Sequence, residues 1–102
     1  QSVSNSDTLD EMRQFETETG WLICPHTAVG TRVARLRPAP DVATVVLATA
    51  SPAKFPETVL EATGREARLP DFATGVTANA EVFERSQASL AAVRERVGKL
   101  AR

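Results

Sequence analysis

One run of seven residues constrains the fold of this chain more than any other feature. Residues 43–49 are Ala-Thr-Val-Val-Leu-Ala-Thr, a run rich in β-branched side chains and nearly continuous in apolar character. Such a run is typical of a strand buried on both faces of a parallel sheet. The chain has no second run of this strength, and a lone buried strand would leave its backbone N–H and C=O groups unpaired. We therefore expect this strand to pair, through residues 45–49, with the remainder of a longer parent chain or with a second copy.

Helical signals surround the predicted strand. Leu9, Met12 and Phe15 recur at helical spacing, and Thr8 with Glu11 three residues later has the spacing of a capping box. Apolar residues at helical spacing, with Pro and Gly at the ends, predict four helices, near residues 7–19, 26–37, 52–63 and 79–100. Residues 65–78 have no clear period and are expected to form a loop. The predicted fold class is therefore α/β, with about four helices and one buried parallel strand, and residues 1–102 are expected to form one incomplete domain.

Composition excludes several classes of partner. The net charge is −1 at pH 7, whereas nucleic acids and anionic membranes both favour a concentrated basic surface. The longest apolar run is far shorter than the roughly 20 residues that a membrane-spanning helix needs. Cys24 is the only cysteine, so no internal disulfide is expected and a reducing compartment, the cytoplasm, fits best. The chain also begins at Gln1 rather than at a methionine, which suggests a fragment of a longer protein.

The first candidate motif is Cys24-Pro25-His26-Thr27-Ala28-Val29-Gly30, which places the only histidine at the start of a predicted helix. A Cys–His nucleophile pair is one interpretation, although adjacency in sequence does not supply the required geometry. A metal site would need two more ligands, so none is predicted. The simpler interpretation is that His26 and Thr27 satisfy polar groups at the helix N-terminus.

The second candidate motif is the turn that follows the predicted strand. Thr49 lies at the carboxyl end of that strand, which is where open α/β sheets bind their ligands. Ser51 and Lys54 lie near the N-terminus of the next helix, a natural site for anions. The alternative is that Ser51 is only an N-cap and Lys54 only a surface charge.

These motifs, taken together, resemble those of a known enzyme family. Three blocks occur in the family's order, namely Thr8-Leu9-Asp10-Glu11-Met12 leading to Thr19-Gly20-Trp21, then Pro25 to Gly30, then Leu47-Ala48-Thr49-Ala50-Ser51-Pro52-Ala53-Lys54-Phe55-Pro56-Glu57. The sequence resembles the C-terminal portion of threonine synthases over roughly residues 7–64. The family often has histidine where this chain has Ser51.

The resemblance implies a fold type II pyridoxal-phosphate enzyme that converts O-phospho-L-homoserine and water into L-threonine and phosphate. It places the family's cofactor-binding lysine and glycine-rich phosphate loop upstream, so Lys54 is not that lysine. No catalytic residue is then expected in this chain, and the isolated chain is expected to be inactive and to bind no pyridoxal phosphate. The resemblance also places the Thr49 hydroxyl at the cofactor's pyridine nitrogen.

Four further residues are implied candidates for one wall of the active site: His26, Thr27, Ser51 and Lys54. A competing hypothesis is a small α/β binding or structural module that self-associates through the predicted strand and has no catalytic role.

Overall fold

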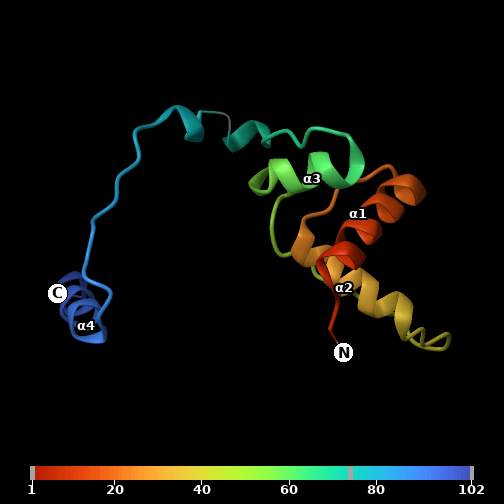
Figure 1. Ribbon diagram of the computed structural model, residues 1–102, viewed down its shortest axis with the longest axis horizontal. Coiled ribbons are helices and arrows are strands. Elements are labelled where there is room, and N and C mark those ends of the chain that lie inside the picture. The colour runs from red at the N-terminus through yellow and green to blue at the C-terminus, as the bar shows by residue number, and fades with distance from the viewer. Residues whose placement is uncertain (1, 74, 102) are drawn as a thin grey trace.

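The structure is a computed structural model that describes residues 2–73 and 75–101 (Figure 1). Residues 1, 74 and 102 of the predicted domain lie outside the described part, and residue 74 belongs to the predicted loop. The described elements, in chain order, are α1 (Asn5–Thr19), α2 (Pro25–Leu36), η1 (Pro52–Lys54), α3 (Pro56–Thr63), η2 (Asp71–Ala73), η3 (Val76–Ala78) and α4 (Leu90–Leu100). None of the described helices has both the length and the apolar character needed to cross a bilayer.

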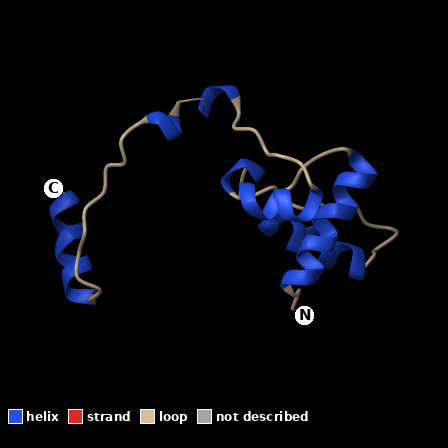
Figure 2. Ribbon diagram, turned by 45° about the horizontal axis from the view of Figure 1, so that its top comes forward, coloured by secondary structure: helices blue, strands red, loops and turns tan. Residues whose placement is uncertain are grey.

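The predicted α/β class is wrong for this structure. The described residues contain helices, turns and extended segments but no strand (Figure 2). Residues 43–49 are extended yet unpaired, and Val45 and Leu47 are 81% and 75% exposed. The β-branched side chains favour an extended backbone, but a strand also requires a neighbouring backbone to accept and donate its hydrogen bonds. No described segment supplies that neighbour.

The first two helices lie close to their predicted bounds. Helix α1 begins two residues before the predicted position, and α2 begins and ends one residue early. The region predicted as one helix at 52–63 is divided at Phe55 into the short 3₁₀ helix η1 and the helix α3. Pro56 explains the division, because proline has no N–H to donate within a helix and is favoured at a helix's first position.

The last predicted helix, 79–100, is only half formed. Residues 80–87 are extended, and α4 begins at Leu90. The reason lies at Ser89, whose hydroxyl accepts a hydrogen bond from the Ala92 N–H at 3.3 Å and caps the helix there. The apolar residues that predicted a helix over 79–100 therefore extend beyond α4, which carries only the second half of that region.

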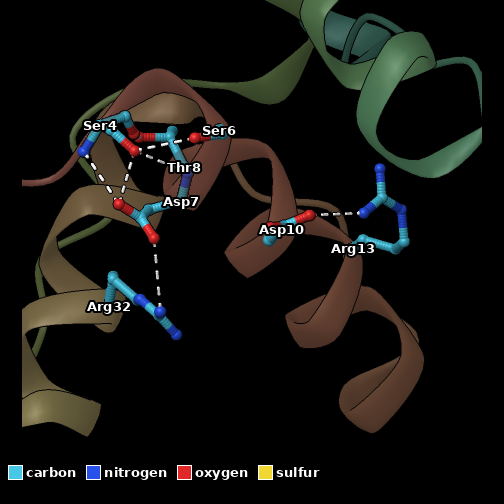
Figure 3. Close-up of polar contacts among 7 residues, drawn as sticks. All are labelled: Ser4, Ser6, Asp7, Thr8, Asp10, Arg13 and Arg32. Carbon is cyan, nitrogen blue, oxygen red and sulfur yellow. Dashed lines mark hydrogen bonds and ion pairs between the residues drawn. The ribbon is translucent and has the colours of Figure 1, made fainter.

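A capping box formed by Ser4 and Asp7 fixes the start of α1 (Figure 3). It lies one turn before the Thr8–Glu11 box that the sequence predicts. The Ser4 hydroxyl accepts from the Asp7 N–H at 3.1 Å, and the Asp7 carboxylate accepts from the Ser4 N–H at 3.3 Å. The Thr8 hydroxyl instead donates to the Ser4 carbonyl. Hydrogen bonds from the Ser4 side chain and backbone, and then the charge of Arg32, hold the pKa of Asp7 below its usual range. The box therefore favours an ionised Asp7 at the positive end of the helix.

A small core joins the first three helices. Helix α1 packs against both α2 and α3 (Figure 1). The fully buried apolar residues of this core are Met12, Ala28, Val59 and Ala62, with Leu9, Leu22, Ile23 and Ala67 packed around them. We call residues 5–64 the three-helix body.

An ion pair from the interior of α1 fastens α2 to the body. Glu11 is fully buried, and its Oε1 accepts from Arg35 Nε at 2.8 Å. The Arg35 Nη2 also donates to Glu18 Oε2 at 2.5 Å, so one guanidinium bridges two carboxylates two turns apart on α1. The two carboxylates, Glu11 first, raise the pKa of Arg35. Because a buried carboxylate without a cation is costly, α2 is held in one register against α1.

We predict that Arg35→Ala lowers the free energy of unfolding by about 3 kcal/mol, since it leaves the buried Glu11 carboxylate without its cation. Denaturant unfolding of the protein that carries this chain measures the loss. Arg32→Ala is the matched control, because Arg32 pairs at 3.5 Å with the more exposed Asp7 and should lose no more than about 1 kcal/mol. Equal losses in the two variants would contradict this account of α2.

Candidate functional site

The two candidate motifs meet in space, although residues 31–48 separate them in sequence. The His26 ring lies 5.0 Å from the Phe55 ring, centroid to centroid, at an interplanar angle of 59°. One turn further along α2, a Cβ atom added at Gly30 would lie 2.8 Å from Cγ1 of Val46. The extended segment before Thr49 therefore lies directly against α2, and the turn after Thr49 lies against the start of α2.

Cys24 holds the start of α2. Its sulfur accepts from the Thr27 N–H at 3.4 Å and lies 3.2 Å from the Thr27 hydroxyl. Burial raises the pKa of the Cys24 thiol, but hydrogen bonds from the Thr27 side chain and from the backbones of Thr27, His26 and Ala50 outweigh burial, so the pKa lies below its usual value. The thiol is thus an N-cap of α2. It is not paired with His26, whose exposed ring lies against Phe55.

The second motif presents its polar groups on the outside of the body. Thr49 is exposed at the end of the extended segment, and Lys54 is exposed at the end of η1. Ser51 is half-buried, and its hydroxyl accepts from the Ala53 N–H at 3.3 Å. The N-cap role considered for Ser51 is therefore present, while the hydroxyl of Thr49 and the ammonium of Lys54 lie at the surface.

The five residues singled out in the sequence fall into two groups. Thr27 is buried, and its hydroxyl is used within the body. The other four lie at or near the surface where the two motifs meet: His26, Thr49, Ser51 and Lys54. Among the described residues, no three His, Cys, Asp or Glu side chains are grouped as a metal site would require.

Sequence reasoning missed the structural roles of three residues that shape this site. Phe55 supports the His26 ring, and Val46 occupies the space that a side chain at position 30 would need. The third is Cys24, in its role as an N-cap. Gly30 was a signal of this packing in the sequence. Glycine within a helix costs about 0.5–1 kcal/mol relative to alanine and needs a compensating reason such as close packing.

An open, mostly apolar groove lies where the extended segment crosses α2. Its volume is about 610 Å³, and it is lined by Val29, Gly30, Val33, Ala34, Arg37, Thr44, Val45, Val46 and Leu47. The groove and the polar turn after Thr49 lie along the same stretch of chain. The body therefore presents a polar turn and, next to it, an apolar face that no described residue covers.

The chain is similar to known proteins in sequence and in structure. The family pattern described as threonine synthase, C-terminal, matches residues 27–97. A threonine synthase from Pseudomonas aeruginosa is 38% identical over an alignment of 88 residues, and the match covers 84% of this chain and 18% of that protein. The crystal structure of a PLP-bound threonine synthase from Brucella melitensis superposes with a TM-score of 0.78 at 35% identity, over 96% of this chain and 21% of that one.

These similarities define the chain as a segment of an enzyme family. The chain belongs to the threonine synthase family and corresponds to its C-terminal portion. It spans about a fifth of the length of the relatives that it matches.

Substitution of Gly30 tests its contact with Val46, because the sign of the change in the free energy of unfolding should depend on the residue at position 46. Gly30→Ala should destabilise the protein by about 1 kcal/mol, because the new methyl group overlaps the stiff Val46 side chain. In a Val46→Ala background the overlap is relieved, and the same change should stabilise by about 0.5–1 kcal/mol, the helical preference for alanine. Denaturant midpoints of the four proteins measure both effects. Stabilisation by Gly30→Ala in both backgrounds would show that Val46 does not constrain position 30.

Proposed function

We propose that this chain is the C-terminal part of a threonine synthase that converts O-phospho-L-homoserine and water into L-threonine and phosphate. As such it is part of a pyridoxal-phosphate-dependent lyase of fold type II and supplies one wall of the active site. The observation that carries the proposal is that the two motifs shared with the family come together in space at the His26–Phe55 contact. Family membership over residues 27–97 supports it independently.

The exposed end of the extended segment fits one requirement of the cofactor. Thr49 presents a neutral hydroxyl at the surface of the body, and such a group can hydrogen-bond a pyridine nitrogen as donor or acceptor. Unlike a carboxylate, it does not force that nitrogen to stay protonated. We assign Thr49 to the pyridine nitrogen of pyridoxal phosphate, which when bound withdraws electrons from the reacting carbons of the substrate.

The remaining candidate residues have different roles in the proposal. Lys54 offers an exposed ammonium on the turn after Thr49, and His26 lies beside the same turn, so both suit a phosphate-bearing substrate. Ser51 and Thr27 are engaged with the backbone and with Cys24, so they position the turn and the start of α2. None of these residues is proposed to bind the cofactor covalently. The lysine that binds the cofactor covalently is assigned to the rest of the longer chain, and the isolated chain is proposed to be inactive.

The proposed partner is the remainder of the longer chain. Its natural contact surface is the groove beside residues 45–49, where Val45 and Leu47 are largely exposed and burial of apolar area favours association. Relatives about five times as long have ample sequence to cover this surface. The single cysteine, Cys24, favours a reducing compartment, and we propose the cytoplasm.

Substitutions at Thr49 test the proposed function in the longer enzyme. Thr49→Val keeps the shape and removes the hydroxyl, and it should lower turnover by about 5- to 150-fold, the equivalent of roughly 1–3 kcal/mol for a lost hydrogen bond in a dry site. Thr49→Ser keeps the hydroxyl and should retain most of the activity. Steady-state rates of threonine formation, with cofactor content checked by absorbance, measure both.

Thr49→Ala serves as the reference that loses both the methyl group and the hydroxyl, and it should resemble Thr49→Val. If Thr49 only fills space, the order reverses, so that valine is tolerated and serine is the damaging change. Near-normal turnover of fully loaded Thr49→Val enzyme would rule out a role for this hydroxyl at the cofactor.

A further inference from the structure

The C-terminal arm, residues 79–101, lies away from the three-helix body (Figures 1 and 2). Every residue of the arm is exposed except Ala92, which is half-buried. The radius of gyration of the chain is 18.4 Å, whereas a compact domain of about 100 residues has about 13 Å. The body therefore does little to stabilise the arm.

The arm carries apolar side chains along one face of α4, a pattern that is typical of a buried helix face. Leu90, Val93, Val97 and Leu100 follow at steps of three, four and three residues, so they line one face of α4. They are 50–72% exposed, and Val82, in the extended part of the arm, is 98% exposed. A helix of 11 residues is also too short to be stable alone in water. Both features require a surface that covers the stripe.

Charge marks the opposite side of α4. Glu95 and Lys99 form an ion pair at 2.7 Å, one turn apart, on the side away from the apolar stripe by the 100° step of the helix. Arg96 pairs with Glu84 of the extended part and ties the helix back along the arm. The arm is thus amphipathic, with one face for solvent and one for a partner surface.

The match to the solved relative extends into the arm. The arm makes up more than a fifth of the 102 residues, so the match over 96% of the chain must include most of it. The TM-score of 0.78 applies to a chain that is about five times as long. In that relative a large remainder of the polypeptide is therefore present for the arm to contact.

We propose that the arm is a clasp whose apolar stripe, Leu90, Val93, Val97 and Leu100, docks on the remainder of the same longer chain. The inference rests on the proposed function only in that the chain is part of such a longer protein. A second copy is a poorer occupant, because one face of an 11-residue helix is too small for the roughly 1,200 Å² that stable interfaces between separate chains bury. Covalent linkage removes that requirement, since it gives an effective concentration in the millimolar range.

Limited trypsin digestion of the intact longer protein tests the clasp, with cleavage after Arg96, which lies within α4, as the readout. In the unmodified protein this site should be protected, at a rate independent of protein concentration. Val93→Glu places a charge within the stripe and should raise the cleavage rate at Arg96 at least about tenfold, because cleavage follows the population of undocked arm. Ala91→Glu is the matched control on the other side of α4 and should leave the rate unchanged.

Cleavage of the unmodified protein at the rate of an unstructured peptide would overturn the clasp. Equal acceleration in the two variants would do the same, and protection that is lost on dilution would assign the stripe to a second copy. Digestion requires neither cofactor nor substrate, so a negative result here leaves the Thr49 series, and with it the proposed function, standing on its own.

Discussion

The close approach of Val46 to Gly30 is the constraint on which the candidate site depends. Because Gly30 has no Cβ atom, the extended segment lies directly on α2 without displacing the Val46 side chain. The segment then delivers Thr49 to the surface, and the chain turns back so that Phe55 meets His26 at the start of α2. The absence of a side chain at Gly30 thereby allows two motifs that are separate in sequence to lie together. The body that holds them has a buried core of only a few residues.

Electrostatics hold the other side of this arrangement. The buried Glu11 carboxylate and Arg35 fix α2 on α1, while the Cys24 sulfur caps α2 by accepting from the Thr27 N–H. Helix α2 is therefore held at both ends, by polar contacts at its N-terminus and by an ion pair near its C-terminus. A rigid α2 gives the extended segment a fixed surface, which is what a site assembled from several parts of a longer chain requires.

Local patterns in the sequence were sufficient for the helices but not for contacts between distant segments. The periodicity of Leu9, Met12 and Phe15 located α1, and Pro25 and Gly64 marked true helix ends. The strand prediction failed because pairing depends on a neighbour that residues 43–49 do not find here. The pairing of His26 with Phe55 and the burial of Glu11 depend on tertiary packing, and the spacing of residues along the chain does not encode it.

Hydrogen exchange at residues 43–49 of the longer protein tests the central claim most directly, namely that the body presents a surface that the remainder of the chain completes. The three-helix body alone leaves the segment exposed and unpaired, so any strong protection must come from outside it. The account predicts that these amides exchange as slowly as those in the interior of α2. Exchange at the rate of an unstructured peptide, with α2 protected in the same sample, would contradict it.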